Sequence, residues 1–154
     1  DFAGIDAINQ RMRGWGLEGS VLERKMQGRP ADPGQKENYL LPSESSEMIK
    51  KILIGEAASA DSCTQMVELL KTQQNRNRLA RPLTANHDHI EFGSKTGTVK
   101  GTCNDAGFYR VGDQALILSV FLNNVSDTPT GEATIGAIAQ AALEDAGILW
   151  SLHP

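Results

Sequence analysis

The segment IEFGSKTGTVKGTCNDAGFYRVGDQALILSVFL, residues 90–122, decides the fold. It contains three short runs rich in β-branched and aromatic residues, and glycine-containing turns such as Gly112-Asp113 separate them. We therefore expect three consecutive antiparallel strands, at residues 90–99, 107–111 and 115–122.

Helical periodicity flanks this segment on both sides. Amphipathic helices are expected at residues 4–13, at 43–55, from Ser59 or Asp61 into the polar stretch that begins at residue 73, and at 130–146. Ser43 and Thr130 have the chemistry of N-caps for the second and last helices. The second and third helices should pack together, and the last should turn one face inward: Ile135, Ile138, Ala139, Ala142 and Leu143. Helices, a three-strand meander and a closing helix predict an α+β protein, and residues 1–154 are expected to form a single domain.

Length and charge narrow the function classes. A chain of 154 residues suits one domain, and its net charge of −4, with basic residues scattered among acidic ones, argues against a nucleic-acid groove or an anionic membrane face. The longest apolar run is broken at Ser119 and falls short of the roughly 18–20 residues of a membrane helix. We expect a soluble, acidic protein with no membrane span. It begins at Asp1 without an initiator Met, which indicates a processed or trimmed chain.

Cysteine and histidine residues point to no cofactor. Cys63 and Cys103 would pair only in an exported protein of suitable geometry, and free, partly buried thiols are the expected alternative. His87-Asp88-His89 has the residue types of a metal site but lacks a third ligand, so it is interpreted as a polar loop.

The residues that carry chemistry lie on the first expected strand, in Ser94-Lys95-Thr96-Gly97-Thr98. An ammonium group supplies positive potential beside a nucleophile, the hydroxyls can bind a carboxylate, and the glycine lets a substrate approach the backbone. We expect Lys95 to be catalytic, and Ser94, Thr96, Gly97 and Thr98 to bind substrate.

The passage KTGTVKGTCNDAG, residues 95–107, resembles the third-to-fourth strand hairpin of the class A β-lactamases and related penicillin-recognising serine hydrolases. Upstream segments fall in the order that this family shows, among them GIDAIN at residues 4–9, LERKM at 22–26 and residues 76–83. The resemblance covers nearly the whole chain, as the carboxyl-terminal part of the family's fold: the last three strands, the final helix and part of the helical lobe.

The resemblance implies an acyl-enzyme mechanism, in which a Ser of a Ser-x-x-Lys motif attacks a β-lactam, amide or ester carbonyl and backbone N–H groups hold the oxyanion. The resemblance also implies roles for single residues. Lys95 would supply positive potential in the active site, Thr96 and Thr98 would bind the substrate carboxylate, and the N–H of Thr98 would contribute to the oxyanion hole. It further implies a periplasmic or secreted location, no cofactor, and a small β-lactam or acyl substrate.

This sequence departs from the family's pattern in several places, and the family's Ser-Asp-Asn motif is one of the features that it lacks. No Ser is followed by a Lys three positions later, so the nucleophile lies outside the chain. Met26 stands where the family has the Glu that activates the deacylating water, which puts turnover in doubt. Glu23 or Glu37 could substitute, although a solvated surface carboxylate is the preferred interpretation of either.

A further departure concerns the strand arginine that binds the β-lactam carboxylate in the family, because Cys103 stands in its place. Arg78 or Arg81 could reach in from the preceding loop, and an ordinary exposed arginine is the alternative.

The family's first two strands pair with its last one, so residues 115–122 would be left as an open apolar edge. An amino-terminal portion of the same protein, or a self-paired copy, is the expected partner there. Two functions remain open: the chain is part of an acylating hydrolase, alone inactive, or it is a non-catalytic binding domain that kept the fold.

Overall fold

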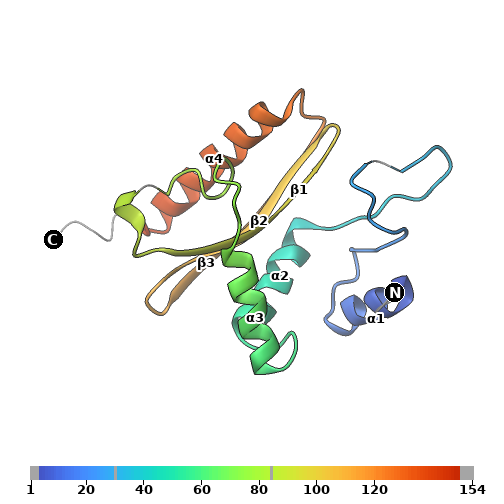
Figure 1. The fold of residues 1–154 in the computed structure, drawn as a ribbon, viewed down its shortest axis with the longest axis horizontal. Helices are drawn as coiled ribbons and strands as arrows, with labels where there is room; N and C mark the ends of the chain where they lie inside the picture. The colour runs from blue at the N-terminus through green and yellow to red at the C-terminus, as the bar shows by residue number, and fades with distance from the viewer. Residues whose placement is uncertain (1–3, 30, 84, 150–154) are drawn as a thin grey trace.

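The computed structural model describes residues 4–29, 31–83 and 85–149. Within these residues three antiparallel strands form one sheet in the order β1-β2-β3, helices α2, α3 and α4 pack on it, and α1 lies apart from it (Figure 1). The elements are α1 Ile5–Gly14, α2 Pro42–Leu53, α3 Ala60–Lys71, a 3₁₀ turn at Ala85–His87, β1 Glu91–Val99, β2 Thr102–Val111, β3 Gln114–Asn123 and α4 Thr128–Asp145. The α+β class and the three-strand meander are confirmed.

Strand β2 begins at Thr102, five residues before the expected start at Gly107. The expected bounds followed the apolar run and left out the polar pair Asn104-Asp105, but both residues lie inside the ladder, opposite Gly97 and Thr96 of β1. The Asn104 side chain accepts the backbone N–H of Leu122 on β3 at 3.0 Å. The expected start was wrong because tertiary contacts satisfy polar groups that read as a break in the strand.

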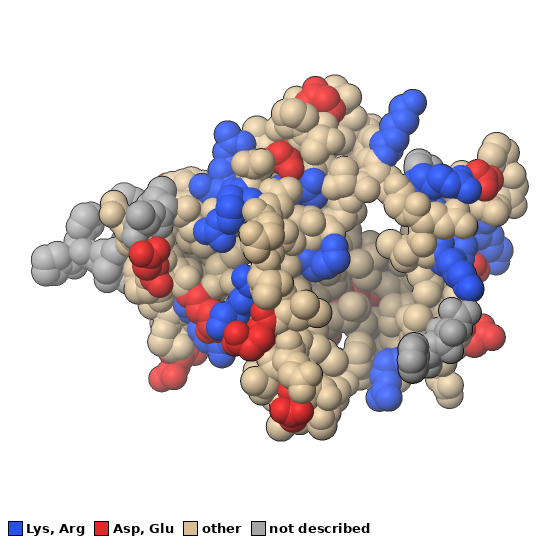
Figure 2. Space-filling view, viewed as in Figure 1, with Lys and Arg blue, Asp and Glu red and all other residues tan. Residues whose placement is uncertain are grey.

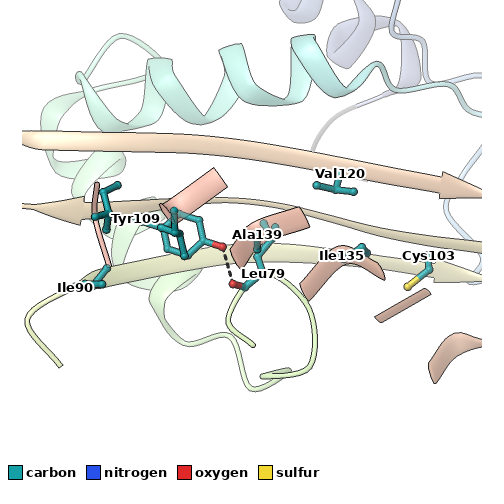
Figure 3. Packing of buried hydrophobic residues seen from close by; sticks show 9 residues of the cluster. Leu79, Ile90, Cys103, Tyr109, Val120, Ile135 and Ala139 are labelled. Atoms are coloured by element: carbon teal, nitrogen blue, oxygen red, sulfur yellow. Dashed lines mark hydrogen bonds between the residues drawn. The ribbon is translucent and has the colours of Figure 1, made fainter. Parts of the chain in front are cut away.

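Helix α4 covers one face of the sheet (Figure 1). Ile135, Ala139 and Leu143 are fully buried against β2 and β3, whereas Ile138, expected to face inward, is 39 % exposed. The cap of this helix is Asp127, whose Oδ1 accepts the Thr130 N–H at 2.8 Å, so the expected cap at Thr130 was wrong by one turn. Figure 3 shows the close packing beneath this helix.

Helices α2 and α3 cover the opposite face and pack on one another, as predicted. Ser59 caps α3 by accepting the Ser62 N–H, which confirms the first of the two expected starts. Ser43 does not cap α2, because the helix already begins at Pro42, a residue suited to the first turn.

Helix α1 and the long loop that follows lie to one side of the sheet (Figure 1). Residues of α1 are at best partly buried, and the loop is closed by a two-residue bridge between Val21 and Tyr39. No helix among the described residues is long and apolar enough to cross a membrane. On the face that Figure 2 draws, acidic and basic side chains are interspersed.

Candidate active site

The Lys-Thr-Gly segment lies on β1, which pairs only with β2 among the described residues and so forms one edge of the sheet. Lys95, Gly97 and Thr98 are exposed and Thr96 is partly exposed, and the Lys95 ammonium donates to the backbone oxygen of Thr96. Ser94 differs from these four, since only 2 % of it is exposed and its hydroxyl is turned away from solvent. The structure therefore presents four of the five expected residues together on an accessible strand edge.

Arg78, one of the two candidate arginines, lies directly behind this segment. Its Nη2 donates to Oγ1 of Thr98 at 2.6 Å, and its Nη1 donates to the backbone oxygens of Gly97 at 3.1 Å and Asn104 at 2.8 Å. Only 3 % of Arg78 is exposed. The interpretation of Arg78 as an ordinary surface arginine was therefore wrong.

The charge of Arg78 is balanced by Glu132 in the first turns of α4. Arg78 Nε donates to Glu132 Oε1 at 3.2 Å, and the Asn75 side-chain amide donates to the same oxygen at 2.9 Å. These two donors hold the pKa of Glu132 below its ordinary value, the Asn75 hydrogen bond contributing most. A buried ion pair is favourable when further hydrogen bonds complete it, as they do here.

The position of Cys103 explains why the arginine is not on β2. Cys103 lies opposite Thr98, is fully buried, and faces Gly131 of α4 so closely that a Cβ on that glycine would lie 2.7 Å from the Cys103 Cβ. An arginine side chain has no room at this position. Arg81, the other candidate, is exposed and lies against Gly136 of α4 instead.

Both cysteines are buried free thiols, as expected. Burial is the largest influence on the Cys103 thiol and raises its pKa. A raised pKa keeps the thiol protonated and unreactive near neutral pH.

The loop that carries Met26 is closed by an ion pair. Arg24 Nη2 donates to Glu37 Oε1 at 2.7 Å, and Glu37 Oε2 accepts the Ala31 N–H at 2.7 Å. Met26 is 80 % exposed, and its sulfur accepts the side-chain amide of Asn38 at 3.3 Å. A thioether has no proton-accepting ability comparable to that of a carboxylate, so Met26 cannot activate water.

Neither nearby carboxylate presents itself as a substitute base. Backbone N–H groups of Ala31 and Asn38, then Arg24, hold the pKa of Glu37 below its ordinary value, which makes it a weaker base. Glu37 is thus a structural clasp of the loop and not the freely solvated carboxylate that was expected. Glu23 pairs with Lys36 at 3.3 Å.

His87 and His89 lie with ring centroids 6.4 Å apart. Within residues 4–29, 31–83 and 85–149, no three His, Cys, Asp or Glu side chains gather closely enough to hold a metal ion.

Sequence reasoning gave no role to three polar residues around Arg78: Asn75, Asp105 and Glu132. The Asn104-Asp105 pair stood out as part of the family's pattern, but its contact with the loop before β1 has no signal in the sequence. Glu132 reads only as an acidic residue in the first turns of a helix.

The Lys-Thr-Gly strand lies at the edge of an antiparallel sheet that has helices on both faces, and this arrangement is part of the β-lactamase fold. A sequence model of the "Beta-lactamase enzyme family" matches residues 1–146. The chain belongs to this family of hydrolases.

Individual relatives agree with this assignment. The chain is 32 % identical to the carbapenem-hydrolyzing β-lactamase KPC of Klebsiella oxytoca, over 95 % of this chain and 50 % of that protein. The crystal structure of a β-lactamase from Sphaerobacter thermophilus superposes with a TM-score of 0.90 at 39 % identity, over 100 % of this chain and 57 % of that one. An ancestral class A β-lactamase (GNCA) gives a TM-score of 0.80 at 26 % identity, over 93 % and 56 %. The chain thus spans about half the length of the relatives that it matches.

Proposed function

We propose that this chain is the carboxyl-terminal half of an acylating serine hydrolase of the β-lactamase type, acting on a β-lactam, amide or ester that bears a carboxylate. The observation that carries the proposal is the contact between Arg78 and Thr98 at the exposed end of the Lys-Thr-Gly segment. Four N–H groups of the guanidinium donate to Glu132, Gly97, Asn104 and Thr98, and the fifth, on Nη2, has no partner among the described residues. That donor and the two threonine hydroxyls suit a substrate carboxylate.

In the proposed reaction the Ser of a Ser-x-x-Lys motif on the amino-terminal portion loses its proton to a neighbouring base and attacks the carbonyl carbon. The carbonyl π electrons move to oxygen, and the backbone N–H of Thr98 is one of the donors that hold the resulting oxyanion. Collapse of this intermediate breaks the C–N or C–O bond, and the leaving group takes up the proton. Lys95 contributes positive potential along this path, and Gly97 leaves the space that the substrate occupies.

The residues of the loop that contains Met26 and Glu37 support the proposal that the acyl group is released slowly. Hydrolysis of the acyl-enzyme needs a base that activates water, and Met26 and the clasped Glu37 do not supply one. We therefore propose that the acyl-enzyme accumulates, and that the protein binds penicillins covalently for longer than an efficient β-lactamase does.

The remaining proposals follow from the same assignment. Residues 1–154 act as a single unit that is completed by the amino-terminal portion of the same protein or by a self-paired copy. The location is periplasmic or secreted, and no cofactor takes part. A non-catalytic binding domain is the competing function, which the replacements at Met26 and Cys103 would suit.

Labelling with a fluorescent penicillin tests the proposal. The complete protein should take up one label on the Ser of its Ser-x-x-Lys motif, located by peptide mass spectrometry, and the isolated chain of residues 1–154 should take up none. An unlabelled complete protein would favour the binding domain. Stoichiometric label on any serine of this chain would overturn the proposed division of the site.

A further inference from the structure

Two buried side chains of β2 hold one backbone position, Leu79, from opposite sides. Asp105 Oδ2 accepts the Leu79 N–H at 3.2 Å. The Tyr109 hydroxyl donates to the Leu79 carbonyl oxygen at 2.6 Å, the hydrogen bond that Figure 3 marks with a dashed line. Asp105, Tyr109 and Leu79 are all fully buried. Together they fix both polar groups of a residue that belongs to a loop without regular structure.

Burying the Asp105 carboxyl group costs free energy, because the group loses its contact with water. A compensating interaction is therefore expected. Desolvation is the largest influence on its carboxyl group and raises the pKa, while the Leu79 N–H, the Ser94 hydroxyl and the Arg78 charge lower it by less. Asp105 Oδ1 and Ser94 Oγ are both buried, and neither makes a hydrogen bond of ordinary geometry. An apolar residue would pack here at lower cost, which indicates that the Leu79 contact is what the carboxyl group provides.

We call the two hydrogen bonds of Asp105 and Tyr109 to Leu79 the clamp. Because Leu79 follows Arg78 directly in the sequence, the clamp is connected to the candidate site. Arg78 must span from its backbone to Thr98 and Glu132, so a displacement of the Leu79 peptide moves the guanidinium relative to β1. The hydrogen bonds from the guanidinium to Gly97, Asn104 and Thr98 do not depend on the clamp. Loss of the clamp should therefore displace the guanidinium slightly but leave the chain folded.

We propose that Asp105, together with Tyr109, is a positioning residue that sets the place of the Arg78 guanidinium behind Thr98, and thereby the affinity of the site for a substrate carboxylate. This inference rests on the proposed function for its consequence in binding, but the geometric part stands on the Leu79 contacts alone. Asp105 acts through Leu79 and Arg78 and touches no substrate.

The groups that face Asp105 determine which charges its carboxylate can interact with. Ser94 lies on β1, Arg78 and Leu79 on the preceding loop, and Tyr109 and Cys103 on β2 itself. Arg78 is the single cation among them, so the carboxyl group and the guanidinium are electrostatically coupled as well as joined through Leu79.

The test compares Asp105→Ala, Asp105→Asn and Tyr109→Phe in the complete protein. Asparagine keeps an oxygen that can accept the Leu79 N–H, whereas alanine does not, and phenylalanine removes only the hydroxyl. Ser46→Ala is the matched control. It removes a partly buried hydroxyl group that donates a hydrogen bond to Ser119, on the opposite face of the sheet. Each variant is acylated with a penicillin and with the same penicillin esterified at its carboxylate.

We expect Asp105→Ala and Tyr109→Phe to weaken binding of the free-acid penicillin by about tenfold, the loss that accompanies one net hydrogen bond. The maximum acylation rate and the reaction of the ester should be unchanged, Asp105→Asn should restore most of the loss, and Ser46→Ala should behave like the parent. Equal losses on acid and ester, or no loss on either, would overturn the inference.

The position of Arg78 is followed separately by the NMR signal of its Nε–H group. That signal should move in Asp105→Ala and Tyr109→Phe and stay in Ser46→Ala. If the parent protein is not acylated by either penicillin, the proposed function fails, while a moved Arg78 signal still supports the positioning role. An unmoved signal in both clamp variants rejects the positioning role whatever the acylation result.

Discussion

Arg78 and Thr98 are twenty residues apart in the sequence, and the guanidinium of the first donates to the hydroxyl of the second at 2.6 Å. This contact joins the loop before the sheet to the exposed end of β1. The contact places the buried positive charge of Arg78 beside Thr98. The residue opposite Thr98 on β2 is Cys103, which carries no positive charge.

Replacing Arg78 by alanine should destabilise the complete protein by about 3–5 kcal/mol, because Glu132 would be left partly buried without its counter-charge. Lysine should restore little, since it lacks the planar fork that reaches several acceptors at once. Urea unfolding measures both effects. Arg81→Ala is the control, and a larger loss there than at Arg78 would contradict the assignment of the site arginine.

The helices and strands were predictable because their patterns are local. Ser59 signals the start of α3 in its own sequence, and the apolar run of β3 needs no partner to be recognised. The cap of α4 was missed because Asp127 and the nearby Thr130 have equally suitable chemistry, and the start of α2 was missed because Pro42 begins the helix one residue before Ser43.

The site was predictable only in part, for a physical reason. Lys95 to Thr98 form a contiguous motif, but the burial of Arg78 depends on Glu132, which lies 54 residues further along the chain. Asp105 likewise gains its contact from Leu79, across 26 residues. Such pairs have no periodicity, so the sequence left Arg78 and Arg81 as equal candidates.

Lys95→Ala in the complete protein should slow acylation more than Lys100→Ala. In the proposed mechanism Lys95 would lie beside the developing negative charge, in a cleft that the amino-terminal portion would shield from water, whereas Lys100 lies on the exposed turn after β1. Removing one such electrostatic contact typically costs about 2.7–4 kcal/mol in the activation free energy. Stopped-flow acylation measures the rates, and equal rates for the two variants would count against the role of Lys95.

Two glycines of the hairpin should respond differently to alanine. A Cβ at Gly107 would lie 2.5 Å from the Gly93 carbonyl oxygen, which is backbone and cannot move aside, so Gly107→Ala should cost about 1–3 kcal/mol in unfolding free energy. A Cβ at Gly97 would lie 3.7 Å from Asn104, an ordinary contact. Gly97→Ala should therefore leave stability within about 0.5 kcal/mol of the parent and slow acylation, because the methyl group enters the substrate's space. Unchanged acylation would remove the proposed role of Gly97.

The loop clasp should open in acid. The pKa of Glu37 is lowered in the folded protein, chiefly by the Ala31 and Asn38 N–H groups, so its stabilisation is present above the ordinary carboxyl pKa and is lost as the pH falls through the lowered value. The Ala31 amide proton should shift with that titration in the NMR spectrum. Glu37→Gln should abolish the titration, and Glu23→Gln should preserve it. A titration that persists in Glu37→Gln would assign it to another group.

Strand β3 should be paired on both sides in any stable form of the protein, with its second partner coming from outside the meander. Its apolar side chains cover both faces: Leu116, Leu118 and Leu122 pack in the α4 core, and Ile117 and Phe121 pack in the α2–α3 core. This arrangement is typical of a central strand, yet β3 pairs only with β2 among the described residues.

An open edge of this composition, with neither proline nor charge, would favour aggregation. In any stable form the chain should therefore be oligomeric, domain-swapped or bound to its amino-terminal portion. Hydrogen exchange of the complete protein decides the question, with β1 as the internal control, because its outward amides border the candidate site and should exchange quickly. The outward amides of β3 should exchange slowly. A verified, soluble monomer of residues 1–154 in which both sets exchange equally fast would show that β3 tolerates an open edge and that no missing strand is required.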